Sequence, residues 1–442
     1  MSSHYTLFLF TVFFILHSTH LTTSTPYLKL PLLKKTPLSP PSHLLAADIR
    51  RLSGHRTSLK SPLTSGAATG SGQYFANLRI GSPPQRLLLV ADTGSDLVWV
   101  KCSACKNCSN HRPGSAFLAR HSRTFSSHHC YDPQCKLVPH PNLPRTCNHT
   151  RIHSPCRYQY SYADGSTTTG FFSKETTTFN TSSGKETKIK NLAFGCGFRI
   201  SGPSVTGASF NGAEGVMGLG RGPISFTSQL GRKFGNRFSY CLLDYTISPP
   251  PKSYLTIGGY SDDAVLNKFS YTPLVTNPLS PSFYYISIES VSVDGVKLPI
   301  SSSVWSIDGS GNGGTIVDSG TTLTFLAEPA YRQVLAAFRR RVKLPPAEGP
   351  ALGFDLCVNV SGVAKPRLPK LRLGLAGKSV LAPPANNYFI EAAERVMCLA
   401  VQPVKAGSGF SVIGNLMQQG YLFKFDLDRS RLGFSRRGCA VR

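Results

Sequence analysis

The chain has 442 residues, more than one hydrophobic core usually supports, so we expect two domains or one large unit built of two halves. Hydrophobic residues make up 40% of the chain, which is enough for a sizeable core. The 48 Lys and Arg against 22 Asp and Glu give a formal charge of +26, but only 16% of residues are charged and the cations are dispersed. This pattern favours a solvated basic surface over a dedicated polyanion-binding segment.

The chain begins with a segment typical of a signal peptide. Residues 7–16, LFLFTVFFIL, form an apolar run that is too short to cross a membrane, and no Lys or Arg precedes it. We therefore assign residues 1–24 to a signal peptide. No other apolar run is long enough for a membrane span, and residues 436–442 contain no hydrophobic tail, so we expect no membrane anchor. The sequence predicts a protein of the secretory pathway.

Residues 25–71 have the composition of a basic pro-segment or leader. Between residues 25 and about 70 there are six prolines and seven basic residues, against the single acid Asp48. This composition suits a flexible leader better than a core element. A basic leader could neutralise a carboxylate-lined cleft until it is removed, and a plain disordered leader is the simpler alternative.

From residue 72 onward the chain has the pattern of a β protein. Residues 73–80 alternate between polar and apolar side chains, and residues 283–293 form a longer run that ends in an Asp-Gly turn signal. Helical pattern is scarce and is strongest over residues 328–342. With 40 Gly and 32 Pro, an all-β fold with few short helices is predicted. The apolar face of the expected helix consists of Tyr331, Val334, Leu335, Phe338 and Val342.

Twelve cysteines fit an oxidising compartment, where disulfide bonds are the natural interpretation. The spacing does not determine the pairing. Seven cysteines lie between residues 102 and 156, a segment that we call the Cys-rich insert, and if all seven are bridged at least one must pair outside it. Seven histidines in the same insert raise the possibility of zinc, yet a secreted chain with many other cysteines favours bridges, so we expect no metal site. The insert holds Cys102, Cys105, Cys108, Cys130, Cys135, Cys147 and Cys156, and the others are Cys196, Cys241, Cys357, Cys398 and Cys439.

Four Asn-X-Ser/Thr sequons are candidates for N-glycosylation and also fit secretion. The sequon is short and common by chance, so it does not tell whether a glycan is attached. The four are Asn107, Asn148, Asn180 and Asn359.

An Asp-containing motif occurs twice, each time directly after an apolar strand. The copies are Asp92-Thr-Gly-Ser and Asp318-Ser-Gly-Thr-Thr. A buried carboxylate is unfavourable unless it is paired or hydrogen-bonded, so two such residues need a common explanation. Each copy is followed by an apolar-apolar-Gly element, at Gly218, 126 positions after Asp92, and at Gly414, 96 positions after Asp318. The surplus of 30 positions in the first copy is absorbed by the Cys-rich insert.

The paired motifs, the two glycine elements and a flap-like segment make residues from about 72 to the end resemble the pepsin-like aspartic proteases, specifically the plant nepenthesin-like group. The Cys-rich insert at 102–156 is similar to an insertion that this group carries early in its first lobe. The saposin-like insert of other plant aspartic proteases is absent from the second lobe. The resemblance implies a bilobal fold, with catalytic lobes at 72–268 and 269–442 and one Asp from each at the floor of a cleft.

The resemblance implies that Asp92 and Asp318 are the catalytic dyad of an acid endopeptidase that needs no cofactor. Two carboxylates within a few ångströms cannot both ionise cheaply, so the pair shares one proton at acidic pH, and aspartic proteases are the established example of this effect. One carboxylate then activates a water that attacks the peptide carbonyl, while the other carboxyl protonates the developing oxyanion.

The resemblance also assigns supporting roles to the motif neighbours. The motif glycines admit a close backbone and supply N–H donors, the last hydroxyl of each motif bonds the outer carboxylate oxygen, and the middle hydroxyl reaches the opposite lobe. The motif glycines are Gly94 and Gly320, the last hydroxyls belong to Ser95 and Thr321, and the middle hydroxyls belong to Thr93 and Ser319. Gly218 and Gly414 match structural glycines that lie against the floor strands, where a side chain would collide.

A hinged flap is expected over residues 160–170, where an Asp-Gly pair gives a hairpin signal around Gly165. Tyr162 stands at the family's flap-tyrosine position, and Trp99 matches the tryptophan that hydrogen-bonds it, with plain core packing as the alternative for both. Ala163 replaces a glycine that is more usual in the flap. We interpret Asp96 and Asp164 as turn or surface acids.

The alternative function is a catalytically silent protein of the same fold that binds and inhibits a glycosidase. Both motifs are intact, which favours an enzyme. A basic lectin-like or nucleic-acid-binding protein would explain neither the repeat nor the leader. We expect a monomer with polypeptide substrates, no nucleic-acid partner and electrostatic contact with acidic cell-wall polysaccharide. The expected location is the apoplast or cell wall, with the vacuole as the alternative.

Overall fold

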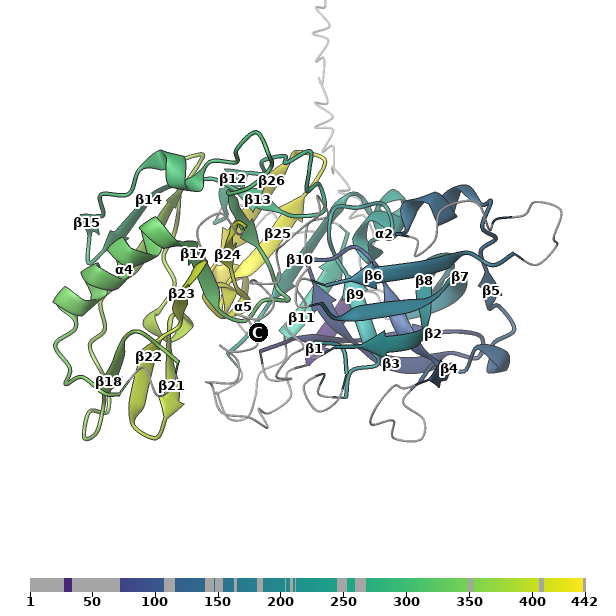
Figure 1. Cartoon of the computed structure of the whole chain (residues 1–442), viewed down its shortest axis with the longest axis horizontal. Coiled ribbons are helices and arrows are strands. Elements are labelled where there is room, and N and C mark those ends of the chain that lie inside the picture. The colour runs from purple at the N-terminus through teal and green to yellow at the C-terminus, as the bar shows by residue number, and fades with distance from the viewer. Residues whose placement is uncertain are drawn as a thin grey trace, which may run out of the picture.

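The computed structural model describes residues 28–33, 72–106, 116–139, 147, 154–162, 165–180, 186–202, 204–206, 210, 212–244, 253–258, 268–348, 353–404 and 409–439. The predicted signal peptide, most of the predicted leader, the sequons at Asn107 and Asn148, and Ala163 and Asp164 lie outside these residues. Figure 1 shows two halves side by side, the first in blue and teal and the second in green and yellow. Strands dominate both halves, so the predicted all-β class is confirmed.

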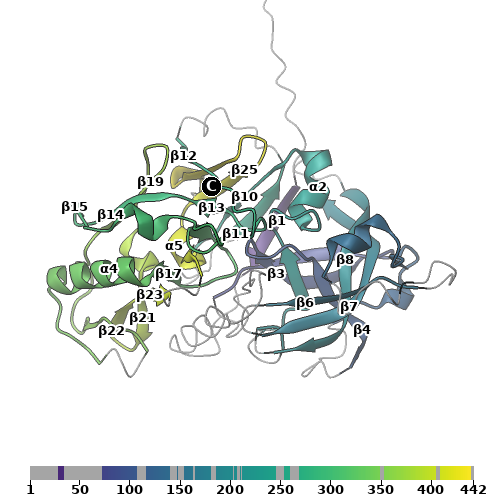
Figure 2. The same cartoon turned by 45° about the horizontal axis from the view of Figure 1, so that its top comes forward.

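The largest sheet has 14 strands and continues from the first half into the second. Its path runs β12-β26-β25-β10-β11-β1-β2-β3-β9-β4-β8-β7-β5, with β6 beside β7. β10 and β25 come from different halves, and they lie next to each other in both views (Figures 1 and 2). The strands are β1 (Leu28–Leu33), β2 (Phe75–Ile80), β3 (Gln85–Asp92), β4 (Trp99–Lys106), β5 (Ser126–Ser127), β6 (Arg157–Ser161), β7 (Thr167–Asn180), β8 (Glu186–Ser201), β9 (Gly215–Gly218), β10 (Arg237–Cys241), β11 (Ser253–Ile257), β12 (Ser270–Pro273), β25 (Leu422–Asp426) and β26 (Arg431–Ser435).

Three smaller sheets complete the second half. The predicted run over residues 283–293 is present, but it is divided into β13 and β14, which belong to different sheets. The five-stranded sheet orders β13 (Tyr285–Ile286), β16 (Thr315–Val317), β24 (Ser411–Ile413), β17 (Thr324–Ala327) and β23 (Val401–Val404). The four-stranded sheet orders β15 (Val296–Lys297), β14 (Ile288–Val293), β19 (Leu371–Leu375) and β20 (Ser379–Leu381), and the three-stranded sheet orders β18 (Cys357–Asn359), β22 (Val396–Leu399) and β21 (Phe389–Ala393).

Helices are few and short, as predicted. α4 (Glu328–Arg341) is the helix expected over 328–342, and its buried Tyr331, Val334, Leu335 and Phe338 face the core of the second half. Its first turn carries an acid and its last turn three arginines, which complement the helix dipole. No helix among the described residues is long and apolar enough to span a membrane. The other helices of the described residues are α2 (Phe226–Phe234), α5 (Asn415–Gln418) and the 3-10 helices η2 (Ala119–His121), η3 (Pro133–Leu137), η6 (Ser302–Trp305), η8 (Ala385–Asn387) and η9 (Arg437–Cys439).

The internal repeat of the sequence corresponds to a repeated strand pairing. β3 ends on Asp92 and pairs in parallel with β9, so that Asp92 is opposite Gly218. β16 ends one residue before Asp318 and pairs in parallel with β24. Strands β9 and β24 each pair with a further strand on their other side, β4 and β17. The runs before the two Asp residues are β3, which lies between β2 and β9, and β16, which lies between β13 and β24. Successive residues at the ends of both strands are buried whichever face they point to, which explains why the sequence before each Asp is a continuous apolar run.

The prediction that residues 25–71 contain no core element is wrong for residues 28–33. This segment forms β1, which pairs antiparallel with β11 and β2 in the large sheet. Leu28, Leu30 and Leu32 are at most 3% exposed, while Lys29 between them lies with its Nζ 4.3 Å from the centroid of the Tyr254 ring. The alternation of leucines with Lys29 and Pro31 is a strand signal that the basic, proline-rich composition of the whole segment concealed. Removal of this segment stays a prediction.

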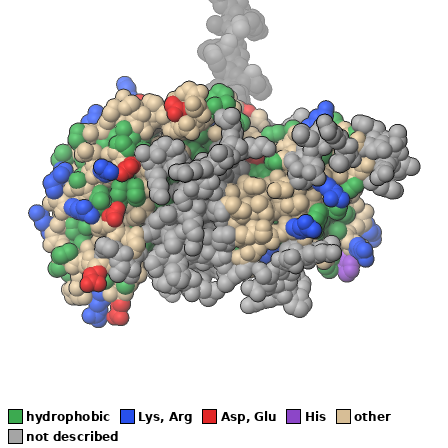
Figure 3. Space-filling view, viewed as in Figure 1, with side chains coloured by type: hydrophobic (Ala, Val, Ile, Leu, Met, Phe, Trp, Pro, Cys, Tyr) green, Lys and Arg blue, Asp and Glu red, His purple; other side chains and the backbone are tan. Residues whose placement is uncertain are grey.

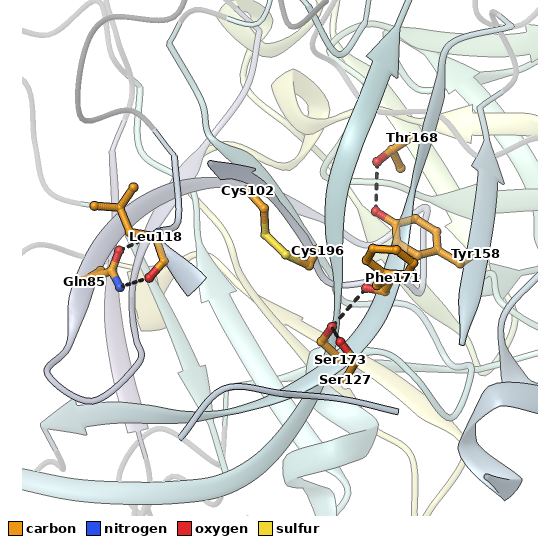
Figure 4. The surroundings of a disulfide bond; sticks show 9 residues. All are labelled: Gln85, Cys102, Leu118, Ser127, Tyr158, Thr168, Phe171, Ser173 and Cys196. Atoms are coloured by element: carbon orange, nitrogen blue, oxygen red, sulfur yellow. Dashed lines mark hydrogen bonds between the residues drawn. A yellow bond between two sulfur atoms is a disulfide. The ribbon is translucent and has the colours of Figure 1, made fainter. Parts of the chain in front are cut away.

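Five disulfide bonds are present among the described residues. Cys102–Cys196 joins β4 of the insert to β8 outside it, and beside it the Gln85 amide exchanges two hydrogen bonds with the backbone of Leu118 (Figure 4). Within the described residues, no group of three or more His, Cys, Asp or Glu is arranged to hold a metal ion. The other bonds are Cys130–Cys147, Cys135–Cys156, Cys241–Cys439 and Cys357–Cys398, whereas the side chains of Cys105 and Cys108 lie outside the described part.

Candidate active site

The ends of β3 and β16 bring Asp92 and Asp318 together where the two halves meet. Both side chains are fully buried. A Cβ atom added to Gly94 would lie 2.9 Å from the carboxyl carbon and both oxygens of Asp318, so the backbone of the first motif touches the carboxylate of the second. A side chain at position 94 would therefore displace Asp318. This steric limit explains why the position is occupied by glycine.

The two carboxylates are held in the same way. Each accepts a backbone N–H at Oδ1 and a hydroxyl at Oδ2, from residues two and three positions later. The donors to Asp92 are Gly94 N at 3.0 Å and Ser95 Oγ at 2.5 Å, and the donors to Asp318 are Gly320 N at 2.8 Å and Thr321 Oγ1 at 2.6 Å. The local sequence Asp-(Thr/Ser)-Gly-(Ser/Thr) thus supplies its own carboxylate with two donors.

The middle hydroxyls of the motifs cross between the halves. Thr93 N donates to Ser319 Oγ at 3.1 Å, and Ser319 N donates to Thr93 Oγ1 at 2.8 Å. Thr93 Oγ1 in turn donates to the carbonyl of Val317 at 3.2 Å, and Ser319 Oγ donates to that of Ala91 at 2.9 Å. Four buried hydrogen bonds therefore fix the two Asp-bearing loops to each other.

The environment of Asp92 favours its protonated form. Burial raises the pKa of Asp92 well above its ordinary value, and the nearby charge of Asp318 raises it further. The hydrogen bonds from Ser95 and Gly94 act in the opposite direction and lower the pKa, but they do not cancel the increase. The site as a whole therefore retains a proton into a pH range where an ordinary aspartate is ionised.

Two further glycines leave no room for a side chain beside this site. A Cβ atom at Gly218 would lie 2.4 Å from the backbone carbonyl carbon of Asp96, and one at Gly414 would lie 2.0 Å from the carbonyl oxygen of Leu323. Real Cβ contacts are never this short with backbone atoms, so both strands approach their neighbours as closely as only glycine permits. The two glycines that the sequence repeat singles out thus lie at close backbone approaches beside Asp92 and Asp318.

The flap-like segment contacts Trp99 in the expected manner. Trp99 Nε1 donates to Tyr162 Oη at 2.6 Å, and both side chains are buried. The ring of Phe210 stacks on Trp99 with centroids 5.9 Å apart. Gly165 has a φ of 81°, a conformation that favours glycine, and it lies in the turn between the paired strands β6 and β7. Tyr162 N donates to the carbonyl of Ser166 at 2.8 Å across this turn, so the segment is a hairpin attached to Trp99 close to its turn.

Two polar side chains of α5 also support the site, and sequence reasoning missed them. Gln418 Nε2 donates to the carbonyls of Asp318 at 3.1 Å and Ile413 at 2.8 Å. Asn415 Nδ2 donates to the carbonyl of Ser319 at 3.0 Å. The sequence offered one signal, since Asn415 follows Gly414 and the apolar strand directly and Gln418 comes three residues later. Both lie in α5, whose four residues are all buried.

The interpretation of Asp96 as a turn or surface acid is wrong. Its side chain is 9% exposed, and it accepts hydrogen bonds from Gly222 N at 2.8 Å and from Ser282 Oγ. Burial raises the pKa of Asp96. A carboxylate four residues after Asp92 looks like a loop residue in the sequence, because the glycine-rich segment that covers it lies more than a hundred residues away.

Comparisons with known proteins give matches over both halves of the chain. Residues 74–259 match a family model described as xylanase inhibitor N-terminal, and residues 283–436 match one described as xylanase inhibitor C-terminal. The aspartic proteinase nepenthesin-2 of Nepenthes gracilis is 36% identical, over 84% of this chain and 79% of its own length. The chain belongs to the pepsin-like aspartic protease family, in its nepenthesin-like group.

Other members of this protease family are similar over most of the chain. Aspartyl protease family protein 2 of Arabidopsis thaliana is 37% identical, over 86% of this chain and 74% of its own length. The crystal structure of edgp superposes on this pepsin-like chain with a TM-score of 0.70 at 22% identity, covering 93% of this chain and 95% of the other. At that identity the structural likeness establishes the fold alone.

Proposed function

We propose that the protein is an aspartic endopeptidase that hydrolyses peptide bonds at acidic pH, with Asp92 and Asp318 as its catalytic dyad. The observation that carries the proposal is the pair of buried carboxylates from two repeated motifs, each with the same two donors. Burying two carboxylates side by side is unfavourable for stability, and a protein that only binds a partner through its surface has no use for them. The names of the relatives support the same activity class.

In the proposed mechanism the pair holds one proton and activates a water molecule. The raised pKa of Asp92 supports this shared proton at acidic pH. The ionised carboxylate takes a proton from the water as it attacks the peptide carbonyl, and the protonated carboxyl group gives its proton to the carbonyl oxygen. Gly94, Ser95, Gly320 and Thr321 keep both carboxyl groups in orientation. Activity is expected to fall as the pH rises and the shared proton is lost.

The hairpin around Gly165 is proposed to cover the substrate, with Tyr162 as its contact residue. The hydrogen bond from Trp99 supports this assignment, because it fixes the phenol beside the turn of the hairpin. We expect polypeptide substrates with hydrophobic residues beside the scissile bond.

A second candidate function is a binding protein that inhibits a glycosidase. It is favoured by one observation, namely that both matching family models are described as xylanase inhibitor domains. In that case the dyad geometry would be retained without its chemistry.

The proposed setting is the secretory pathway, with the apoplast or cell wall as destination and the vacuole as the alternative. The disulfide bonds support an oxidising compartment. Lys and Arg side chains are scattered over the visible face of both halves in Figure 3, which supports diffuse electrostatic contact with acidic wall polysaccharide. Extraction of wall fractions with salt tests that contact, because electrostatic retention weakens at high ionic strength.

The deciding experiment is proteolysis of a denatured protein substrate between pH 3 and 7, with and without pepstatin, after removal of the leader has been verified. Asp92→Asn and Asp318→Asn should each reduce activity by about 100-fold or more, since each removes a group that transfers a proton. Asp308→Asn is the matched control, because Asp308 is an exposed carboxylate whose hydrogen bonds to described residues all lie within its own loop. Full activity of either dyad variant would contradict the assignment, and an inactive wild type that inhibits a glycosidase would favour the second candidate.

A further inference from the structure

Asp96 forms a bridge between the two halves of the molecule that the proposed mechanism does not use. Its Oδ1 accepts the N–H of Gly222 at 2.8 Å, and its Oδ2 accepts the hydroxyl of Ser282. Asp96 and Gly222 belong to the first half, whereas Ser282 belongs to the second and precedes β13. The buried carboxylate is thus a direct link between segments that are 186 positions apart in the sequence.

The loop that covers Asp96 is shaped around the carboxylate. A Cβ atom at Gly220 would lie 2.3 Å from Oδ1 of Asp96, and one at Gly222 would lie 2.1 Å from its Oδ2. The same loop is bonded to the first motif, because Leu219 N donates to the carbonyl of Asp92 and Gly220 N to that of Ser95, both at 2.8 Å. The two glycines therefore permit a close contact that also holds the backbone at Asp92.

On the other side, the bridge continues to Asp318. Arg221 N donates to the carbonyl of Ser282 at 3.0 Å, and Tyr284 Oη donates to the carbonyl of Leu219 at 2.7 Å. The carbonyl of Tyr284 accepts the N–H of Val317, the residue before Asp318, at 3.1 Å. An unbroken path of hydrogen bonds and two-residue steps therefore joins the carboxylate of Asp96 to the strand that carries Asp318.

We propose that Asp96 is a positioning residue, whose carboxylate fastens the loop after Asp92 to the segment that supports Asp318 and so sets the relation between the two carboxyl groups. Its catalytic consequence rests on the proposed protease function, whereas the bridge itself does not. A displacement of about 1 Å in a catalytic group can reduce the rate about 100-fold, so a bridge of this kind is expected to act on kcat.

The bridge is built to survive protonation of Asp96. The titratable groups beside it are Tyr160, whose hydroxyl oxygen accepts the Asp96 N–H at 3.2 Å, and Tyr284, both of which interact electrostatically with its carboxylate. Among the described side chains no Lys or Arg forms an ion pair with Asp96, and Arg221 donates instead to the carbonyl of Val275. A serine hydroxyl both donates and accepts, so a protonated Asp96 can donate to Ser282 while its other oxygen still accepts from Gly222.

Two substitutions of Asp96 distinguish the effect of its hydrogen bonds from the effect of its negative charge. Asp96→Asn has the hydrogen-bonding pattern of the protonated form, because its oxygen can accept from Gly222 and its amide can donate to Ser282. Asp96→Ala leaves both of those donors without their acceptor. Asp308→Ala is the matched control, since it removes a carboxylate with three hydrogen bonds that all lie within one exposed loop.

The first measurement is steady-state hydrolysis of a peptide substrate at acidic pH. Asp96→Ala should lower kcat about tenfold or more with a smaller change in KM, Asp96→Asn should recover most of that loss, and Asp308→Ala should resemble the wild type. If Asp96→Ala is not secreted, Ser282→Ala takes its place, because it cuts the bridge and leaves the carboxylate. A wild-type kcat in Asp96→Ala, or in Ser282→Ala if it takes its place, would overturn the proposal.

The second measurement does not depend on activity. Urea midpoints of Asp96→Ala, Ser282→Ala and the double variant form a cycle, in which the bridge predicts that the double variant is no less stable than Asp96→Ala alone. Additive losses would refute the bridge. If the wild type hydrolyses no protein but the cycle shows coupling, the protease function fails and the bridge stands. If the wild type is active and the losses are additive, the protease function stands and the bridge fails.

Discussion

Replacing Thr93 by valine removes one hydroxyl and changes the side chain little in shape, yet it disrupts the contact between the halves. The substitution takes away the acceptor of Ser319 N and the donor to the carbonyl of Val317, both of which are buried. A buried polar group that loses its partner costs about 1–3 kcal/mol, so the two together predict a loss of about 2–6 kcal/mol. Against a total stability of about 5–15 kcal/mol, that is a large fraction.

Thr256→Val provides the matched control. Thr256 is a fully buried threonine of β11, and among the described residues its hydroxyl has no hydrogen-bond partner. The same chemical change there should leave stability unchanged or raise it slightly, because it removes a buried polar atom that is not satisfied.

The assay is urea unfolding followed by tryptophan fluorescence. The chain has only two tryptophans, Trp99 in the first half and Trp305 in the second, and both are buried, so the signal reports both halves. Thr93→Val should have the lower midpoint of the two variants, at an unchanged slope. If both variants unfold at the same urea concentration, the hydrogen bonds of Thr93 do not hold the halves together and the reasoning fails.

Two further predictions concern stability. Because burial raises the pKa of Asp92 and Asp96 in the folded state, the unfolded chain releases these protons first as the pH rises. The stability that these two groups contribute is then fully present below the ordinary aspartate pKa and declines as the pH passes through the raised values. They should therefore make the urea midpoint lower at pH 7 than at pH 4. If Asp92→Asn and Asp96→Asn leave that difference unchanged, this cause is wrong. In the chain that retains its leader, Leu30→Ala should cost about 2–5 kcal/mol, because Leu30 is buried in β1, whereas the exposed Lys29→Ala should cost far less, and equal midpoints would show that β1 does not belong to the core.

Much of the site was predictable because its donors are local. In Asp-(Thr/Ser)-Gly-(Ser/Thr) the N–H and the hydroxyl that hold each carboxylate come two and three residues later, so the motif carries its own geometry. The apolar runs before Asp92 and Asp318 were visible in the sequence as well, because they form β3 and β16, whose last residues are buried on both faces. The helix α4 was predictable from the spacing of its buried face.

The parts that sequence reasoning missed depend on partners far along the chain. Asp96 is buried only because Gly222 and Ser282 close over it, and nothing within a few residues of Asp96 indicates either. β1 was hidden by prolines and lysines, and its burial depends on β11, more than two hundred residues later. The disulfide pairing likewise follows from which strands become neighbours, as for Cys102 and Cys196, and not from the spacing of cysteines.

The pairing of β10 with β25 has a consequence for the order in which the molecule is made. The ribosome synthesises β10 long before β25 and β26. Cys241, the last residue of β10, is 198 positions from its disulfide partner Cys439. Until those late strands arrive, one edge of β10 has unpaired N–H and C=O groups, the kind of edge that recruits other chains. The first half therefore cannot finish folding during its own synthesis. Its completion waits for a late segment of the second half, and until then that edge of β10 can pair with another chain.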